Sequence, residues 1–293
     1  MQPRLRSGQP LGTLAGYRLL RQIGHGATSA VHLAEHVATQ RVVALKVLPL
    51  PAGPTRAAAG TQFLEAASAA GRLQHPHIVQ VHDAGLLDDV AWLAMEPVAG
   101  GDLARYTRPL RLLPEALVLR LCSRVASALA HAHRQGVVHR DLKPANVLVN
   151  WADDVVKLAD FGLARTSAAS RTGTGIVMGT PSYMAPEQLA GALPSPATDL
   201  YALGVLLFEL LVGRLPHQGQ SMGELLRQVA NEPAPDLQGL RPDLPVNLAQ
   251  LVASLLAKAA AGRPRDGDAV ALQLRLLGQA LSKPPDGVGV KSR

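Results

Sequence analysis

The feature that most constrains the fold is the run of residues 139–146 (HRDLKPAN), followed by the triplet 160–162 (DFG). Between the two motifs, Val147–Val149 and Val155–Leu158 are short apolar runs rich in β-branched residues, which favours strands. We therefore expect a loop, a pair of short strands and a second loop. Two aspartates, an asparagine and a lysine are concentrated in the two loops.

These polar side chains suit phosphoryl transfer. This reaction needs Mg²⁺ on the phosphates, a carboxylate near the acceptor hydroxyl and cations on the transferring group. Asn146 and Asp160 offer oxygen ligands of the hard type that Mg²⁺ prefers. Asp141 can orient a hydroxyl and accept its proton, and Lys143 can hold the γ-phosphate. A chance occurrence of both motifs in this order is very improbable.

Two weaker motifs precede this region. Residues 24–31 (GHGATSAV) place glycines between two strands, where backbone N–H groups can approach phosphates without a Cβ clash. Taken alone, this segment could equally be a simple β-turn. Lys46 lies in the apolar strand segment 43–46 (VALK), where a lysine needs an anionic partner or solvent. Downstream of a glycine-rich loop, it suits a cation that reaches the α- and β-phosphates.

The motifs together resemble the eukaryotic-like serine/threonine protein kinases, especially the bacterial branch, over residues 17–281. Residues 179–187 (GTPSYMAPE) are similar to the family's substrate-docking loop and its Ala-Pro-Glu element. Asp199 resembles the buried helix aspartate that braces the catalytic loop, and Arg263 resembles the arginine that pairs with the element's glutamate, Glu187. The resemblance implies an α+β, bilobal protein-kinase-like fold with a β-rich N-lobe, a mainly helical C-lobe and an ATP cleft between them.

Periodicity and turn residues give the outline of the chain. The predicted parts are an N-terminal extension 1–16, an N-lobe 17–97, a hinge 98–101, a C-lobe 102–281 and a flexible tail 282–293. The predicted strands are Ala30–Ala34, Val42–Leu48, Ile78–His82 and Ala91–Met95. The predicted helices are Thr61–Leu73, Pro114–Gln135, Thr198–Val212, Met222–Ala230, Asn247–Ala260 and Gly267–Leu281.

The resemblance also implies an ATP site. Met95 would be the gatekeeper at the back of the adenine pocket, Glu96 and Val98 would offer backbone groups to adenine, and Asp102 would contact the ribose. The metal, Mg²⁺ (or Mn²⁺), would be held by Asn146 and Asp160. The full expected ATP-binding set is Ile23, Gly24, Gly26, Val31, Ala44, Lys46, Met95, Glu96, Val98, Asp102, Asn146, Leu148 and Asp160.

The same resemblance bears on the acceptor. Lys143 within the motif argues for serine or threonine acceptors on protein substrates. Thr180 matches the hydroxyl that bonds Asp141 and Lys143 in serine/threonine kinases. The catalytic group expected from the resemblance is therefore Asp141, Lys143 and Lys46, together with a carboxylate that holds Lys46.

Activation by phosphorylation is expected as well. Arg140 precedes the catalytic aspartate, and in the family such an arginine misorders the site until it pairs with an activation-loop phosphate. Thr172 and Thr174 lie where bacterial members autophosphorylate, although ordinary loop threonines would look the same. A transient homodimer is one arrangement that would allow autophosphorylation.

One position departs from the family pattern. Active kinases pair the strand lysine with a glutamate on the first helix, and counts from Phe63 and from His75 both place it at position 66, which is Ala66. The nearby carboxylate is Glu65, one position early, or about 100° around the helix. A helical bulge could restore its register toward Lys46. The alternative is that this pair is missing or supplied from elsewhere.

Two functional hypotheses therefore stay open. The first is an active kinase that transfers the γ-phosphoryl of Mg-ATP to protein serine and threonine hydroxyls, supported by the intact residues 46, 141, 146 and 160. The second is a pseudokinase-like nucleotide-binding scaffold, motivated by Ala66 and by Ser29 in place of the third glycine. A kinase-fold enzyme for small molecules is disfavoured by the docking loop 179–187, which suits a peptide.

Composition excludes some classes of function. Net charge is +7, but the arginines are scattered and not interleaved with aromatic residues, so we expect no nucleic-acid partner. The longest apolar stretches are too short for a membrane segment. The single cysteine, Cys122, is expected to be a small core residue and fits a reducing, cytoplasmic compartment.

Overall fold

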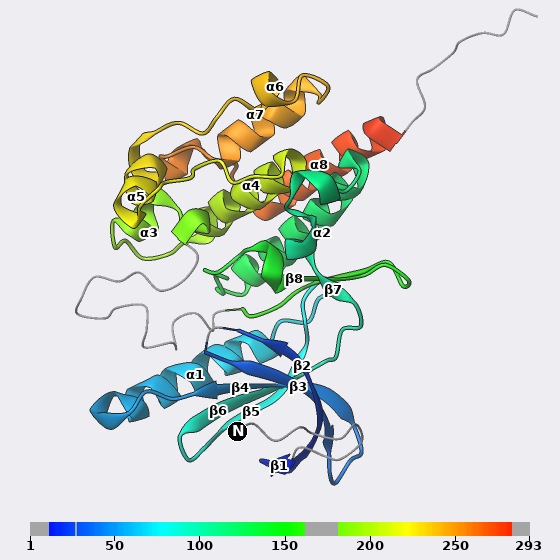
Figure 1. The fold of residues 1–293 in the computed structure, drawn as a ribbon, viewed down its shortest axis with the longest axis vertical. Coiled ribbons are helices and arrows are strands. Elements are labelled where there is room, and N and C mark those ends of the chain that lie inside the picture. The colour runs from blue at the N-terminus through cyan, green and yellow to red at the C-terminus, as the bar shows by residue number, and fades with distance from the viewer. Residues whose placement is uncertain (1–11, 27, 162–180, 283–293) are drawn as a thin grey trace, which may run out of the picture. The chain divides into compact units, whose positions relative to one another are not determined.

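The computed structural model describes residues 12–26, 28–161 and 181–282. The chain divides into two compact units, one built from residues 1–101, 134–140 and 148–179 and the other from residues 102–133, 141–147 and 180–293. The first carries the large β-sheet and the second carries most of the helices (Figure 1). The predicted combination of a β-rich lobe and a mainly helical lobe is therefore confirmed.

The first unit is built on a six-stranded antiparallel sheet of order β1-β2-β3-β4-β6-β5. Its strands are β1 (Gly12–Leu14), β2 (Tyr17–His25), β3 (Ala30–His36), β4 (Val42–Pro49), β5 (Val81–Leu87) and β6 (Val90–Met95). Strand β1 lies inside the segment that the sequence treats as an extension. It pairs with the start of β2, where Leu14 lies opposite Tyr17.

The predicted strand Ile78–His82 begins later in the structure, because the residues before β5 have another partner. Ile78 forms a parallel bridge with Leu158, and the Val79 N–H donates to the Leu158 carbonyl over 2.9 Å. This segment therefore joins the strand that precedes Asp160, and β5 starts only at Val81.

Helix α1 (Arg56–Gly71) packs on the sheet through the apolar side chains of Phe63 and Ala67, which join Leu93 and Met95 in a buried cluster. The helix begins earlier than the predicted Thr61. Its first turn contains a run of alanines with no apolar periodicity but with the highest intrinsic helix propensity.

A second sheet has three strands in the order β7-β8-β9, namely β7 (Gly101–Asp102), β8 (Val147–Asn150) and β9 (Val155–Leu158). Gly100, just before β7, has φ +120°, and a Cβ built on it would lie 2.1 Å from the Val149 carbonyl oxygen. Only glycine allows this backbone conformation and this approach to β8.

The second unit is organised around helix α4 (Pro196–Val212), which lies among the other helices of this unit (Figure 1). Every residue of α4 from Thr198 to Leu211 is buried. Gly204 of α4 lies against Leu255 of α7 (Val246–Leu255), and Gly278 of α8 (Gly267–Ser282) lies against Leu119 of α2 (Glu115–Arg134). The helices are α2 (Glu115–Arg134), α3 (Pro186–Leu189), α4, α5 (Met222–Asn231), α6 (Leu237–Leu240), α7 (Val246–Leu255) and α8 (Gly267–Ser282).

Helix α7 ends earlier than the predicted Ala260 because Arg263 competes for the following backbone. Its guanidinium donates to the carbonyls of Ala257 over 2.9 Å and of Lys258 over 3.1 Å. These carbonyls are therefore bound by a side chain rather than by a continuing helix.

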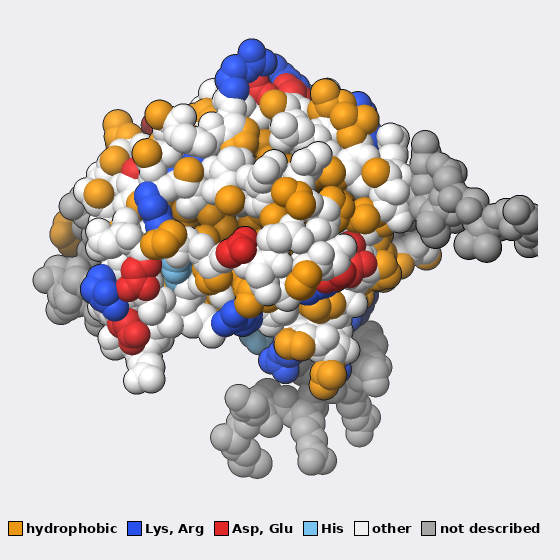
Figure 2. All heavy atoms as spheres, turned by 90° about the horizontal axis from the view of Figure 1, so that it is seen from above, with side chains coloured by type: hydrophobic (Ala, Val, Ile, Leu, Met, Phe, Trp, Pro, Cys, Tyr) orange, Lys and Arg blue, Asp and Glu red, His pale blue; other side chains and the backbone are white. Residues whose placement is uncertain are grey.

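The single cysteine and the basic side chains have the distribution expected of an ordinary globular chain. Cys122 on α2 is fully buried, and burial raises the pKa of its thiol to about 12, as expected for an inert core residue. On the face shown in Figure 2, Lys and Arg side chains form separate small groups rather than one stripe. Within residues 12–26, 28–161 and 181–282, no helix has the length and apolar character needed to cross a bilayer.

Candidate active site

Two residues of the predicted phosphate site meet in the first unit. Lys46 lies in the middle of β4, opposite Val31 of β3 and Leu93 of β6. Its Nζ lies 2.7 Å from Oδ2 of Asp160, and the two side chains are 12% and 24% exposed. Asp160 adopts a left-handed backbone with φ 67°. Such strain in a residue other than glycine is a reason to look for function.

The segment that carries Asp160 is held from the side by His139. This buried imidazole donates from Nε2 to the Ala159 carbonyl over 2.8 Å, which fixes its tautomer because a carbonyl only accepts. The same ring meets Phe161 edge-on, with centroids 4.6 Å apart. His139 is therefore a packing and hydrogen-bonding residue, and the described residues contain no cluster of three or more potential metal ligands.

The second unit carries the other half of the predicted machinery in a small hydrogen-bonded network. Lys143 Nζ donates to Asp141 Oδ2 over 2.6 Å. The Asn146 amide donates from Nδ2 to the Asp141 carbonyl over 2.7 Å and to Asp141 Oδ2 over 3.1 Å. A lysine and an amide thus fix the orientation of one carboxylate. Because Asn146 uses Nδ2 on Asp141, its Oδ1 is the atom that it can offer to a metal.

Glu65 does not meet Lys46 in this structure. Helix α1 is regularly α-helical throughout, without the bulge that would shift its register. Glu65 is exposed, whereas Ala66 is partly buried and packs against the cluster that contains Phe63 and Leu93. The inward position counted from the sequence is therefore occupied by a methyl group, and Lys46 pairs with Asp160 instead.

The glycine-rich segment forms the end of β2 and the start of β3. Gly24 lies opposite Val31, and the Gly26 N–H donates to the Ser29 carbonyl over 2.7 Å. A Cβ on Gly26 would lie 2.9 Å from Ser29 Oγ, so the serine occupies space next to the second glycine. Ile23, just before it, is 41% exposed and available for contact.

Three residues of the predicted ATP-binding set, Met95, Val98 and Leu148, lie in or against one apolar cluster. Met95 is 7% exposed and lies opposite Ala44 in the sheet. Val98 and Leu148 pack against the cluster to which Met95 belongs. Asp102, predicted to contact the ribose, accepts from the Ala104 N–H over 3.0 Å through Oδ1 and so caps the short helix Leu103–Tyr106.

A charged pair at Glu96 was not anticipated from the sequence. Glu96 Oε1 accepts from Lys157 Nζ of β9 over 2.5 Å and from the Gln80 N–H over 2.8 Å. The Glu96 N–H is itself bound to the Gln80 carbonyl over 2.9 Å, so the backbone group that Glu96 can offer to a ligand is its carbonyl. The available signal was a lysine inside the apolar strand Val155–Leu158, which needs an anion.

The predicted pair of Glu187 with Arg263 is confirmed. Arg263 donates to both carboxylate oxygens, over 2.6 and 2.8 Å, and its side chain is fully buried. Thr198 Oγ1 donates to Glu187 over 3.1 Å, and the guanidinium lies 5.0 Å above the Tyr201 ring. Burial works to raise the pKa of Glu187, but the hydrogen bonds from Arg263 and Thr198 outweigh it and hold the pKa below its ordinary value.

Two further buried contacts support α4. Asp199 is 1% exposed and bonds to His133 Nε2 over 2.8 Å. Tyr183 donates a hydrogen bond to the buried carboxylate of Glu209. Burial raises the pKa of the Tyr183 hydroxyl and of the Glu209 carboxyl, and the hydrogen bond from Tyr183 partly offsets the rise at Glu209. The end of the predicted docking segment is therefore fixed to the central helix.

Three predicted residues lie outside the described residues, namely the phosphorylation sites Thr172 and Thr174 and the acceptor-loop residue Thr180. Their assignments stay predictions.

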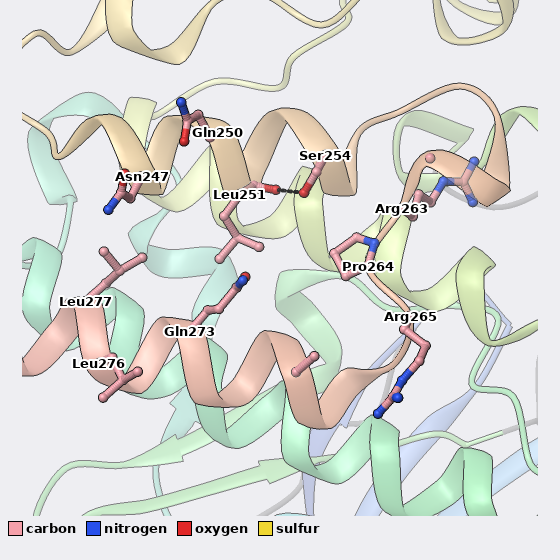
Figure 3. A pocket seen from close by; sticks show the side chains of 12 residues that line it. Asn247, Gln250, Leu251, Ser254, Arg263, Pro264, Arg265, Gln273, Leu276 and Leu277 are labelled. Carbon is pink, nitrogen blue, oxygen red and sulfur yellow. Dashed lines mark hydrogen bonds between the residues drawn. The ribbon is translucent and has the colours of Figure 1, made fainter.

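A groove of about 680 Å³ runs between α7 and α8, with Gln273 directed toward Leu251 (Figure 3). It contains none of the residues predicted for ATP binding or catalysis.

Comparison with known proteins adds independent findings. A family model described as protein kinase domain matches residues 17–272. Serine/threonine-protein kinase PrkC of Bacillus subtilis is 36% identical over 243 residues, which is 83% of this chain and 37% of the relative. Serine/threonine-protein kinase pkn3 of Myxococcus xanthus is 38% identical over 88% of this chain and 49% of the relative. The chain thus spans less than half the length of these two relatives.

Other relatives are matched over more of their length. Serine/threonine-protein kinase PknL of Mycobacterium tuberculosis is 36% identical over 92% of this chain and 67% of the relative. Among solved structures, the kinase domain of Mycobacterium tuberculosis PknI superposes with a TM-score of 0.72 at 33% identity, covering 94% of this chain and 99% of that one.

Proposed function

Because the chain belongs to the family of serine/threonine protein kinases, we propose that it transfers the γ-phosphoryl of Mg-ATP to serine and threonine hydroxyls of proteins. Use of ATP and a divalent metal is general to this family. The observation that carries the proposal is the network of Asp141, Lys143 and Asn146. It presents an oriented carboxylate beside a cation, as in-line transfer to a hydroxyl requires.

Each member of the network has a distinct role in the proposal. Asp141 orients the acceptor hydroxyl and takes up its proton. Lys143, which bonds to Asp141 over 2.6 Å, keeps the carboxylate in place and places positive charge where the γ-phosphoryl carries negative charge. Asn146 fixes the same carboxylate through Nδ2 and offers Oδ1 to the metal.

The donor set fits a hard divalent cation. Asp160 supplies a carboxylate and Asn146 an amide oxygen, and neither involves the sulfur or imidazole ligands that softer metals prefer. Mg²⁺ bound there would neutralise charge on the phosphates. Lys46 would hold the α- and β-phosphates. Its bond to Asp160 keeps the ammonium group on β4 beside the carboxylate in the segment after β9.

The second candidate, a nucleotide-binding scaffold with little turnover, is favoured by one observation. Glu65 is exposed and Ala66 takes the inward position on α1, so the usual carboxylate partner of Lys46 is missing from α1 in this arrangement. In an active enzyme, Asp160 alone would orient the ammonium group of Lys46. The alternative is that α1 rotates and brings Glu65 inward.

The two candidates are separated by incubating the purified chain with Mg-ATP and measuring its intact mass, beside an Asp141→Asn control. The kinase proposal predicts added phosphate on the wild type alone, and phosphate transfer to a generic basic protein. Peptide mapping should place phosphate at Thr172 or Thr174. An active enzyme with both threonines unmodified would overturn the activation-loop assignment but leave the kinase proposal standing.

If the wild type neither gains phosphate nor labels the substrate, the scaffold is the better reading. Binding of Mg-ATP is then measured by calorimetry. Tight binding without turnover supports the scaffold, and absence of binding refutes both candidates.

A further inference from the structure

Leu110 is almost fully exposed. It is the central residue of a short helical turn, Pro109–Arg111, and the residue is 99% exposed. The following Leu112 and Leu113 are partly buried, so the segment is anchored and Leu110 projects from it. One exposed leucine is ordinary on a protein surface. The charges around this one make it unusual.

Four exposed arginines lie near Leu110, three along the chain and one through a neighbouring turn. Arg111 belongs to the same turn as Leu110, Arg108 directly precedes the turn, and Arg105 lies in the short helix Leu103–Tyr106 before it. Arg214 joins them because Gly213, at the end of α4, lies against Pro109, so that a Cβ built on Gly213 would be 2.8 Å from the Pro109 nitrogen. We call Leu110 and these four arginines the Leu110 patch. Among the described residues, none of the four arginines has a carboxylate partner.

Two carboxylates near this segment, those of Glu115 and Asp243, share one basic partner, Arg241. Arg241 bonds to Glu115 over 2.5 Å and to Asp243 over 2.6 Å. Its Nη1 also donates to the Leu211 carbonyl at the end of α4. These carboxylates are therefore bound to Arg241 rather than to an arginine of the Leu110 patch.

We propose that the Leu110 patch binds the surface of an anionic phospholipid bilayer, with Leu110 inserted among the acyl chains and the arginines at the phosphates. An apolar side chain that projects outward suits a bilayer, which deforms around it, whereas a folded partner would need a matching pocket. Basic side chains near an anionic leaflet add attraction that salt weakens. This contact is peripheral and needs no spanning helix.

The test is cosedimentation of the whole chain with vesicles of phosphatidylcholine, with and without phosphatidylglycerol. The wild type should sediment only with the anionic vesicles, and less at high salt. Leu110→Gln should lower the partition coefficient at least about tenfold, since it removes the inserted apolar side chain. The double variant R108Q/R111Q should lower it about thirtyfold, equivalent to about 1 kcal/mol for each arginine.

Matched controls test whether position matters. Leu193→Gln removes another leucine, 88% exposed, outside the patch. The double variant R227Q/R275Q makes the same change in net charge. Both controls should keep the partition coefficient within about twofold of the wild type, because neither site belongs to the inserted surface.

Three outcomes would overturn the proposal. The first is no binding to anionic vesicles, and the second is equal losses in R108Q/R111Q and R227Q/R275Q, which would assign binding to net charge. The third is tighter binding of soluble poly-glutamate than of vesicles, unaffected by Leu110→Gln, which would assign the patch to an acidic polypeptide. Circular dichroism of each variant checks that the exposed substitutions leave the fold intact.

Discussion

The buried pair of Glu187 and Arg263 allows a quantitative prediction. Glu187→Gln keeps the shape of the side chain and removes its charge. The Arg263 side chain is fully buried, so its guanidinium would lose its counter-ion without gaining water. An amide also presents an N–H₂ group to one of the two guanidinium N–H donors that now meet a carboxylate oxygen.

The structure sets the size of the effect. Removing one partner of a buried ion pair costs about 3–5 kcal/mol. Arg263 keeps bonds to the carbonyls of Ala197, Ala257 and Lys258, and it keeps the face of the Tyr201 ring. These contacts compensate in part, so the free energy of unfolding should fall by the lower figure, about 3 kcal/mol. The melting temperature should fall by roughly 5–10 °C.

Urea unfolding followed by circular dichroism measures this loss, with Glu35→Gln as control. Glu35 pairs with Arg18 at the surface, where the side chains are 45% and 25% exposed for Arg18 and Glu35, so the control should lose at most about 1 kcal/mol. Because the folded pKa of Glu187 is depressed, its contribution is present above the ordinary value of 4.5 and fades as pH falls below it. Equal losses in the two variants would refute the reasoning.

Three other predictions concern Glu65, Glu209 and Gly100. Glu65→Ala should change the rate of phosphate transfer less than about threefold, since the side chain is exposed and Lys46 pairs with Asp160; a loss above about a hundredfold would show that Glu65 reaches Lys46 during turnover. Tyr183→Phe removes the hydrogen bond to buried Glu209 and should lower the free energy of unfolding by about 1–3 kcal/mol. Because burial raises the pKa of Glu209, this loss should be larger at about pH 8, where the carboxylate must be charged, than at about pH 5, and a loss independent of pH would contradict the assignment. Gly100→Ala should cost about 3 kcal/mol or prevent folding, because of its φ of +120° and the 2.1 Å approach to Val149, whereas Gly71→Ala, with open space around it, should be neutral or stabilising in the same melting experiment.

The parts of the fold that were predictable from sequence are those with local signals. Periodicity and turn residues alone predict the apolar run of α4, strands β3, β4 and β6, and helix α2. The pairing of Glu187 with Arg263 followed from the family resemblance, because those residues stand at matching motif positions. The Asp141 network is local as well, since Lys143 and Asn146 lie within five positions of it.

The parts that sequence could not give depend on contacts between distant segments. Ile78 is a β-branched apolar residue and was predicted to begin the strand that became β5. In the structure it pairs instead with Leu158. Lys157 is flanked by apolar residues in the sequence. Its partner Glu96 lies far away along the chain and reaches it only in the folded structure. Lys46 pairs with Asp160 rather than Glu65 because of how α1 is rotated about its axis. Ala66 alone does not fix this rotation.

The proposed function depends on phosphate transfer that uses the carboxylate of Asp141. The most direct measurement is the rate at which the wild type and the Asp141→Asn variant phosphorylate a basic protein substrate from Mg-ATP, with nucleotide affinity measured in parallel. We expect the rate to fall at least about a hundredfold in the variant, with ATP affinity little changed, because the carboxylate acts on the acceptor and not on the nucleotide. Equal rates in the two proteins would contradict it.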